Sequence, residues 1–394
     1  KKLGNLTTKI GSGKTPKGGS ENYTNKGIPF LRSQNIRNGK LNLNDLVYIS
    51  KDIDDEMKNS RTYYGDVLLN ITGASIGRTA INSIVETHAN LNQHVCIIRL
   101  KKEYYYNFFG QYLLSRKGKR KIFLAQSGGS REGLNFKEIA NLKIFTPTIF
   151  EEQQKIGQFF SKLDQQIELE EQKLELLQQQ KKGYMQKIFS QELRFKDENG
   201  EDYPDWKEKK LGDITEQSMY GIGASATRFD SKNIYIRITD IDEKSRKLNY
   251  QNLTTPDELN NKYKLKRNDI LFARTGASTG KSYIHKEEKD IYNYYFAGFL
   301  IKFKINEQNS PLFIYQFTLT SKFNKWVKVM SVRSGQPGIN SEEYAKLPLV
   351  LPNKLEQQKI AKFLDRFDRQ IELEKQKIEI LQQQKKGLLQ SMFI

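Results

Sequence analysis

Hydrophobic residues recur at alternating intervals of four and three along two long stretches of the chain, residues 152–189 and 356–393. The first series begins with Ile156, Phe160 and Leu163. This spacing places the apolar side chains on one stripe of an α-helix, and it is typical of a helix that pairs in a coiled coil. The pattern therefore predicts two long helices, each with one apolar seam.

The two stretches are copies of each other. They align without a gap, and the segments EQQKI, QIELE and QQQKKG are identical in both. Weaker copies surround them, among them Lys-Leu-Gly at 2–4 and 210–212 and Thr-Gly-Ala-Ser at 72–75 and 275–278. A repeat of this size indicates a duplicated architecture. We expect the order domain, helix, domain, helix, with boundaries at 1–150, 151–191, 192–354 and 355–394.

The helices have stayed nearly identical while the domains have diverged. We therefore expect the helices to contact the same partner twice and each domain to contact something different. The second half also carries residues 194–208 ahead of its Lys-Leu-Gly segment, with no counterpart in the first half. On this comparison we expect a leader segment of that kind ahead of Lys1.

Short runs rich in apolar and β-branched residues predict strands in each domain. They cover 28–31, 67–72 and 95–100 in the first, and 234–239, 270–275 and 299–303 in the second. One helical stretch follows in each domain, at 104–126 and 311–330, and then a glycine-containing loop and a last strand that leads to a proline. The expected fold class is α+β, with two α/β domains joined by the long helices.

Four charged residues interrupt the apolar seams and predict how the helices pair. They are Glu170 and Lys181 in the first helix and Glu374 and Lys385 in the second. Parallel helices in register would oppose like charges where desolvation makes repulsion costly, whereas antiparallel helices can pair Glu170 with Lys385 and Lys181 with Glu374. We expect an antiparallel intramolecular coiled coil with pseudo-twofold symmetry and a domain at each end. Self-association between molecules stays open, because any helix rich in Glu, Lys and Gln supports it.

The composition points to a polyanionic partner. The formal net charge is +19, and a charge of that size favours binding to nucleic acid. The single cysteine, Cys96, excludes an internal disulfide and a thiolate-clustered zinc site, which fits the reducing cytoplasm. No apolar run approaches the roughly 18 residues of a membrane span, so we expect no membrane partner.

Motifs that imitate a catalytic site are incomplete. The segments TKIGSGKT (8–15) and TGASTGKS (275–282) end like a phosphate-binding loop, but threonine replaces the first glycine in both. His94 near Cys96 lacks a third ligand for a metal. We therefore expect no catalytic residues, no metal and no cofactor. A nucleic-acid enzyme, such as a nuclease or ATPase, stays open as the alternative, and so does a structural coiled-coil protein that binds no nucleic acid.

The chain resembles the specificity subunit of type I restriction-modification enzymes. The resemblance rests on the EQQKI, QIELE and QQQKKG segments, the Lys-Leu-Gly starts and the Thr-Gly-Ala-Ser turns, which recur twice in the same order. It implies two target-recognition domains that bind the two halves of a gapped, double-stranded DNA target. It also implies two methyltransferase (modification) subunits docked on this chain, restriction (translocase and nuclease) subunits that join through them, and no catalysis by the chain itself.

The residues expected to contact DNA are side chains in loops that can grip phosphate or read base edges. In the first domain they are Lys14, Thr15, Lys17, Arg32, Gln34, Asn35, Arg37, Thr72, Ser75, Arg78 and Arg131. In the second they are Tyr220, Arg228, Arg237, Thr239, Arg274, Thr275, Ser278, Lys281, Arg333 and Gln336. The helix surfaces around 178–182 and 382–386, nearly invariant between the copies, are the expected docking sites for the methyltransferase.

Overall fold

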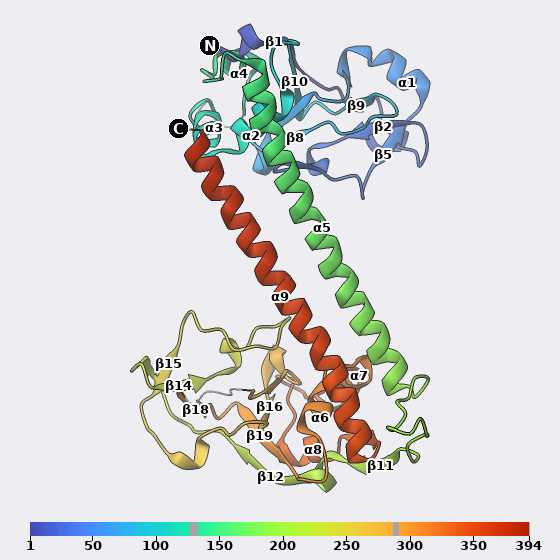
Figure 1. The fold of residues 1–394 in the computed structure, drawn as a ribbon, viewed down its shortest axis with the longest axis vertical. Coiled ribbons are helices and arrows are strands. Elements are labelled where there is room, and N and C mark those ends of the chain that lie inside the picture. The colour runs from blue at the N-terminus through green and yellow to red at the C-terminus, as the bar shows by residue number, and fades with distance from the viewer. Residues whose placement is uncertain (127–132, 287–290, 394) are drawn as a thin grey trace. The chain divides into compact units, whose positions relative to one another are not determined.

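The computed structural model describes residues 1–126, 133–286 and 291–393 (Figure 1). The chain divides into two compact units, Lys1–Lys173 with Glu374–Ile394, and Leu174–Leu373. Two helices, α5 (Phe150–Phe189) and α9 (Lys354–Met392), contribute to both units. Each unit therefore consists of one globular domain and a segment of each long helix.

The main sheet of the first unit is antiparallel, in the order β1-β10-β7-β8. Its strands are β1 (Thr7–Ser12), β10 (Val95–Leu100), β7 (Val67–Asn70) and β8 (Thr79–Ile81). Alternate side chains of β7 and β10 face opposite sides. One side packs on α2 (Tyr106–Leu114) and α3 (Arg116–Leu124), and the other packs on a second sheet.

This second sheet has the order β5-β2-β9-β6 and is mixed, because β2 and β9 run parallel. Its strands are β5 (Val47–Ile49), β2 (Ile28–Leu31), β9 (Ala89–Leu91) and β6 (Arg61–Thr62). Smaller elements complete the domain: the hairpin β3 (Ile36–Arg37)–β4 (Lys40–Leu41) and the helices α1 (Lys51–Glu56) and α4 (Phe136–Asn141).

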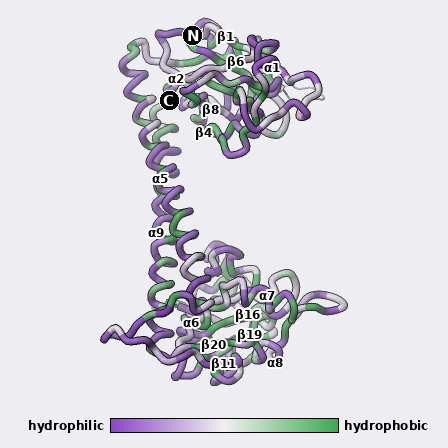
Figure 2. Tube along the Cα trace, turned by 90° about the vertical axis from the view of Figure 1, so that its right-hand side faces the viewer, coloured by the Kyte–Doolittle hydropathy of each residue, from purple (hydrophilic) through white to green (hydrophobic). Residues whose placement is uncertain are grey.

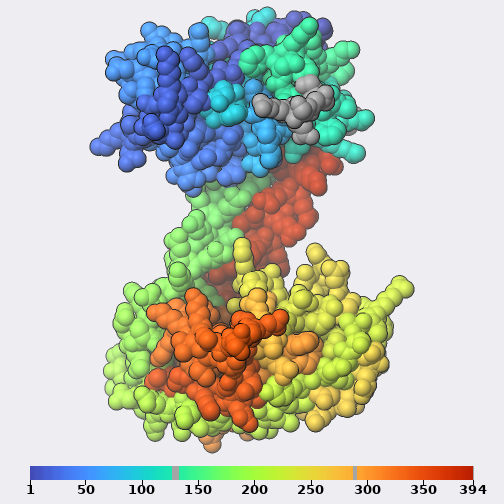
Figure 3. Space-filling view, turned by 180° about the vertical axis from the view of Figure 1, so that it is seen from behind, coloured from blue at the N-terminus to red at the C-terminus, as the bar shows by residue number. Residues whose placement is uncertain are grey.

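The second unit repeats the main sheet in the order β12-β19-β16-β17. These strands are β12 (Thr215–Tyr220), β19 (Leu300–Ile305), β16 (Ile270–Ala273) and β17 (Ser282–Ile284). Among the described residues of this unit, three two-stranded sheets accompany it: β14 (Asn233–Ile236) with β18 (Asn293–Phe296), β13 (Ala226–Arg228) with β15 (Thr254–Pro256), and β11 (Lys207–Lys210) with β20 (Pro348–Leu351). The described helices of this unit are α6 (Pro311–Phe317), α7 (Ser321–Met330) and α8 (Ser341–Ala345). They belong to the part of the chain that is coloured orange in Figure 3.

The strands predicted at 28–31, 67–72, 95–100, 234–239, 270–275 and 299–303 are confirmed, although several end earlier than expected. The last strand predicted before a proline is present in the second unit as β20, but the prediction is wrong for the first unit, where Lys143 forms only an isolated bridge with Lys2. The run at 67–72 ends as a strand at Asn70, and the run at 234–239 ends at Ile236, because a 3-10 turn follows each. The prediction of one helix over 104–126 is wrong, since the chain breaks at Ser115, whose hydroxyl caps the next helix by accepting the Gly118 N–H at 3.1 Å. The stretch 311–330 breaks in the same way before Thr320.

The long helices run antiparallel in each unit, as the seam charges predicted. In the first unit Asp164 of α5 pairs with Lys385 of α9, and later in α5 Lys173 pairs with Glu374 at 2.7 Å. The residue numbers therefore fall on one helix as they rise on the other. Figure 2 shows that both helices are mostly hydrophilic, with hydrophobic positions recurring along them.

The predicted partners of the seam charges are wrong. Glu170 does not bond Lys385, and Lys181 and Glu374 each have another partner. The observed pairs are Asp164–Lys385, Glu170–Lys377, Lys173–Glu374 and Lys181–Asp368. This register differs from the predicted one by roughly one heptad, a shift that leaves every apolar position in the seam. Charges beside the seam, which the prediction left out, therefore decide the register.

Two aspartates at equivalent places in the repeat join each domain to both helices. In the first unit the Gln111 side chain on α2 donates to Asp164 at 2.7 Å, while the other carboxylate oxygen accepts from Lys385. In the second unit Gln316 on α6 donates to Asp368 at 2.7 Å, and Lys181 binds its other oxygen at 2.7 Å. Each domain therefore holds α5 and α9 through one carboxylate.

Candidate nucleic-acid interface

In the first unit, four loops meet at one end of the main sheet. The chain leaving β1 bonds the turn between β9 and β10, where the Lys14 N–H donates to the Leu91 carbonyl at 2.8 Å. The β9–β10 turn also bonds the loop after β7, because the Ile71 N–H donates to the His94 carbonyl at 3.0 Å. The Asn70 side chain ties the loop after β2 to the turn after β7 by donating to the Ser33 carbonyl and the Ser75 hydroxyl.

A set of backbone hydrogen bonds, here called the loop frame, recurs in both units. In the first unit it comprises Gly13 N–Val95 O, Lys14 N–Leu91 O, Asn92 N–Leu31 O, Ile71 N–His94 O and Leu134 N–Ile71 O. In the second it comprises Gly221 N–Leu300 O, Ile222 N–Phe296 O, Ala297 N–Ile236 O, Arg274 N–Phe299 O and Ile339 N–Arg274 O. All ten donor–acceptor distances lie between 2.8 and 3.1 Å. The same loops are therefore fixed in the same way twice.

One glycine in each loop frame allows the segment after the first strand of the main sheet to lie close to the neighbouring turn. A Cβ placed on Gly13 would lie 2.0 Å from the Leu91 carbonyl oxygen, and one on Gly221 would lie 2.2 Å from the Ala297 carbonyl oxygen. No side chain fits at such distances. Close backbone approach is one of the positional meanings of a glycine beside a strand.

The side chains that the loop frame presents differ between the units. His94 in the first unit is replaced by Phe299 in the second, and Ile71 is replaced by Arg274. The His94 imidazole bonds the Thr72 hydroxyl at 2.6 Å, whereas the Arg274 guanidinium lies over the Tyr220 ring at 4.9 Å. Matching backbone hydrogen bonds with different side chains allow the two units to recognise different ligands of one chemical class.

Most of the predicted residues of the first unit lie in or beside these loops with accessible side chains. Lys14, Lys17, Gln34 and Arg37 are exposed, and Thr15, Arg32, Thr72, Ser75 and Arg78 are half-buried. Asn35 is a correction, because it is fully buried and its amide bonds Arg32 N and Asn42 O, so it shapes the turn and cannot read a base. Arg131 lies outside the described residues.

Three predicted cations of the second unit are engaged within the protein. Arg237 binds both carboxylate oxygens of Asp240 at 2.8 and 2.9 Å, and hydrogen bonding to Asp240 raises the pKa of Arg237. Lys281 is buried and pairs with Glu243 at 2.8 Å. Arg333 binds Glu343 and two backbone carbonyls. The remaining candidates are accessible: Tyr220, Arg228, Thr239 and Gln336 are exposed, and Arg274, Thr275 and Ser278 are half-buried.

The sequence reasoning missed three residues of the β9–β10 and β18–β19 turns. Gln93 is exposed, His94 is half-buried beside Thr72, and the Phe299 side chain is 59% exposed. These turns carry no basic cluster, which is the pattern that predicted the other candidate residues. The exposed phenylalanine at a position equivalent to a polar residue is the feature that could have identified them.

The segments that imitate a phosphate-binding loop lack its structure. The first is part of β1 and the loop after it, and the second leads into β17. A phosphate-binding loop instead leads into a helix whose N-terminus faces the phosphate. Within residues 1–126, 133–286 and 291–393, no three His, Cys, Asp or Glu side chains gather as metal ligands. Cys96 is buried, and burial raises its pKa to about 12.

No helix in the part of the chain that the structure describes has the length and apolar character needed to span a bilayer.

Comparison with known sequences identifies relatives across both halves. The family model for the type I restriction modification DNA specificity domain matches residues 1–179 and 203–383. A Methanocaldococcus jannaschii protein, provisionally named a type I restriction enzyme MjaX specificity subunit, is 26% identical over 201 residues, which are 49% of this chain and 47% of that protein. The chain thus matches about half the length of that relative. The StySPI specificity subunit of Salmonella potsdam is 21% identical over 353 residues, covering 86% of this chain and 75% of that one.

A solved structure shares the fold. The type I restriction-modification S subunit from M. genitalium has a TM-score of 0.67 and 15% sequence identity, and the match covers 100% of this chain and 95% of that one. The family model covers both halves of the repeat, each with its domain and most of its long helix. The chain therefore belongs to the type I restriction modification DNA specificity domain family.

Proposed function

We propose that this chain is the DNA sequence-specificity subunit of a type I restriction-modification enzyme, which acts in the cytoplasm and has no catalytic site. Residues 1–150 and 192–354 serve as target-recognition domains, one for each half of a gapped, double-stranded DNA target. One observation carries the proposal: the loop frame occurs twice with the same hydrogen bonds but presents different side chains. This arrangement is what we expect of two related domains that read different half-sites.

The charge of the chain supports DNA as the ligand. The formal net charge is +19, and exposed cations such as Lys14, Lys17, Arg37 and Arg228 lie in or beside the loops. Cations of this kind hold the phosphate backbone and set the position of the protein on the duplex. Half-buried side chains such as Thr72 and Arg274 can then reach base edges. We expect binding to duplex DNA that weakens steeply with salt, because each phosphate contact releases counterions.

A duplicated helix surface supports docking of two identical partners. In the first unit Leu169 of α5 and Ile380 of α9 are 65% and 55% exposed. In the second unit their equivalents, Leu373 of α9 and Leu176 of α5, are 64% and 54% exposed. Exposed apolar side chains that recur in both copies fit a partner bound twice. We assign this surface, with the flanking QQQKKG segments, to two methyltransferase subunits, through which restriction subunits join the complex.

The test is to express the chain with its neighbouring methyltransferase and to sequence the modified bases of the host DNA. The proposal expects a gapped motif with two different halves. The variant Lys14→Gln with Gln93→Ala should change recognition of one half only, and Arg228→Gln with Thr239→Ala should change only the other. The exposed Lys51 lies away from the loop frame, so Lys51→Gln is the control and should leave the motif unchanged. If both halves changed with either variant, or no motif formed with an active methyltransferase, the proposal would be wrong.

A further inference from the structure

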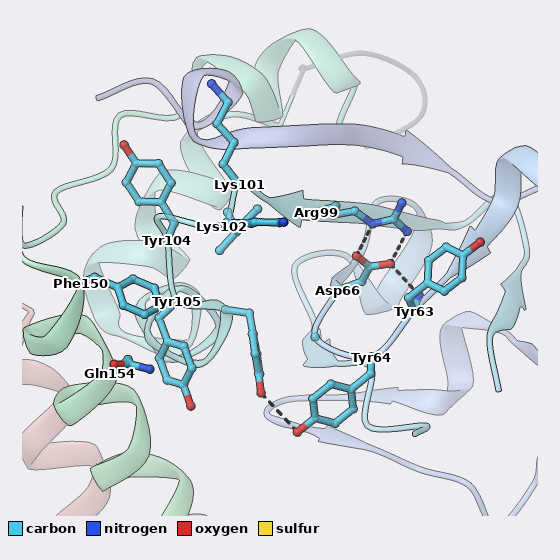
Figure 4. A pocket seen from close by; sticks show the side chains of 13 residues that line it. Tyr63, Tyr64, Asp66, Arg99, Lys101, Lys102, Tyr104, Tyr105, Phe150 and Gln154 are labelled. Carbon is cyan, nitrogen blue, oxygen red and sulfur yellow. Dashed lines mark hydrogen bonds and ion pairs between the residues drawn. The ribbon is translucent and has the colours of Figure 1, made fainter. Parts of the chain in front are cut away.

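A cavity of about 570 Å³ lies in the first unit, beside the start of α5 (Figure 4). One wall comes from Tyr63 and Tyr64, which precede β7, and another comes from Tyr105 at the start of α2 with Phe150 of α5. The segment Arg99 to Lys102 at the end of β10 completes it. The volume falls within the range of roughly 300–1,000 Å³ that is usual for small-molecule sites.

This cavity is separate from the proposed DNA-reading loops. Strand β7 begins beside the cavity, just after Asp66, and ends at Asn70 beside the Thr72 turn. Strand β10 runs the other way, from the His94 turn to Leu100 in the cavity wall. The two sites therefore lie at opposite ends of the same sheet, so a ligand in the cavity is not the DNA held by the loop frame.

The walls combine aromatic rings with free positive charge. The rings of Tyr64 and Tyr106 meet edge to face at 5.8 Å, and the Tyr64 side chain is 55% exposed, so an aromatic face stays open to a ligand. Lys101 and Lys102 are exposed, and neither forms an ion pair with another described residue. The Tyr106 hydroxyl donates to the Tyr64 hydroxyl at 3.2 Å. Burial raises the pKa of Tyr106, so the hydroxyl stays neutral and adds no negative charge to the site.

The turn that forms the cavity is duplicated, but its chemistry is not. Gly65 has a φ of 85°, and Asn268, its equivalent in the second unit, has a φ of 71°, so the same turn is present in both. The side chains around it are unrelated. Tyr63, Tyr64, Tyr104, Tyr105, Tyr106 and Phe150 are replaced by Lys266, Arg267, Asn309, Ser310, Pro311 and Lys354. The second unit therefore does not repeat the aromatic lining of this cavity, whereas the loop frame and the exposed apolar positions of the long helices occur in both units.

We propose that this cavity binds a nucleotide, with the base against the Tyr64 ring and the phosphate at Lys101 and Lys102. Aromatic rings offer a stacking surface that any base can use. Lysine amines bind phosphate as point charges. A base with a 5′-phosphate occurs both as a free nucleotide and at the end of a single strand, so the shared chemistry defines the site. The assignment rests on the cavity alone and is independent of how the chain reads DNA.

Isothermal titration calorimetry of the full chain with AMP tests the proposal. We expect one site per chain, and at least tenfold weaker binding to the variant Lys101→Gln with Lys102→Gln. The matched control is Lys26→Gln with Lys51→Gln, which removes two exposed lysines elsewhere in the same domain and should bind as the parent does. Binding that is absent at millimolar AMP, or equal in the two variants, would overturn the proposal.

The ring contact needs a separate variant. Tyr64→Ala opens no core cavity, because more than half of this side chain is already exposed, and it should weaken AMP at least fivefold without lowering the melting temperature. Tyr250→Ala, at a tyrosine 47% exposed in the other unit, is the control. Inorganic phosphate that binds as tightly as AMP would exclude a role for the base. If a 5′-phosphorylated pentanucleotide competes with AMP, the site is supported and its ligand is the end of a strand. If AMP binds but the pentanucleotide does not compete, the ligand is a free nucleotide.

Discussion

At the scale of single residues, Gly13 and Gly221 are positions in the loop frame where the observed backbone leaves no room for a side chain. Gly13→Ala would drive a Cβ to 2.0 Å from the Leu91 carbonyl oxygen, so the backbone of one strand must move. We expect a loss of about 1–3 kcal/mol in the free energy of unfolding, as overpacking typically produces. Chemical denaturation followed by circular dichroism measures it, and Gly221→Ala should behave likewise.

Two neighbouring glycines provide the controls. A Cβ on Gly11 or on Gly223 would meet no atom within 4 Å, and neither residue has a positive φ. Gly11→Ala and Gly223→Ala should therefore leave the free energy of unfolding within about 0.5 kcal/mol of the parent, as surface substitutions do. Equal losses at Gly11 and Gly13 would show that the close approach to Leu91 is not the cause.

Residue type predicted where the candidate DNA site lies better than it predicted which residues belong to that site. The loops after the strands were expected to gather basic and polar side chains, and Lys14, Gln34 and Thr72 lie in the loops that the frame joins. Arg237 and Arg333 have the same chemistry but bind carboxylates three and ten residues later in the chain. Such pairing depends on turn geometry, which the sequence pattern does not specify.

Asp230, in the loop before β14, gives a prediction on pH. Burial alone would raise its pKa, but hydrogen bonds from the Asn233 backbone and side chain and the Lys232 backbone outweigh burial and lower the pKa to about 2. Because the folded pKa lies below the unfolded value of about 3.9, this carboxylate stabilises the fold above about pH 4 and loses that effect as the pH falls towards 2. Asp230→Asn should therefore lower the melting temperature at pH 7 and differ less from the parent at pH 3. A constant difference at both pH values would contradict this explanation.

At the scale of elements, the helices show what a heptad pattern can and cannot predict. Apolar spacing located both helices within two residues of their observed ends, and the seam charges gave the antiparallel direction. The register was wrong because a shift of one heptad preserves the seam. Asp164 and Lys377, which lie beside the seam, supply the missing partners of Lys385 and Glu170.

A double-mutant cycle checks this register. The side chains of Asp164 and Lys385 are 25% and 14% exposed, so their ion pair is partly shielded from solvent. We expect Asp164→Ala and Lys385→Ala to show a coupling of about 1–2 kcal/mol in urea denaturation, as close pairs do. The pair Glu170 and Lys385, the alternative register, should show coupling near zero. A coupling of that size between Glu170 and Lys385, with none between Asp164 and Lys385, would instead support the register that the sequence predicted.

At the scale of the whole molecule, the repeat predicted the architecture because duplication leaves a record that needs no structural knowledge. The order of domain, helix, domain, helix followed from two near-identical segments. What the domains present could not be predicted, since divergence changed the side chains of the loops and kept their backbone. Arg274 at the position of Ile71 is one case, because the same backbone hydrogen bonds present an apolar side chain in one unit and a guanidinium in the other.

The repeat also predicts that residues 1–191 on their own form a homodimer, because a second copy can supply the residues that the second half of the chain supplies. Each half of the repeat contains both members of the helix ion pairs, because Lys181 is equivalent to Lys385 and Asp164 to Asp368. In a dimer, Lys181 of one copy would bind Asp164 of the second. The core of the first unit also receives Phe393, the residue directly after α9, whose ring stacks on Phe160 at 5.8 Å. Phe189 of the second copy is its equivalent and can fill that place.

Light scattering coupled to size-exclusion chromatography measures the mass of this half-chain. Lys181→Asp should yield monomers, because two such copies would oppose the new carboxylate to Asp164 of the other. Adding Asp164→Lys reverses both charges and should restore the dimer. If Lys181→Asp only destabilised the half-chain, the second charge change would not restore the dimer. Recovery of the dimer therefore distinguishes loss of the Lys181–Asp164 ion pair from general destabilisation. Since one domain would then be present twice, the dimer should also specify a symmetric motif when it is expressed with the methyltransferase.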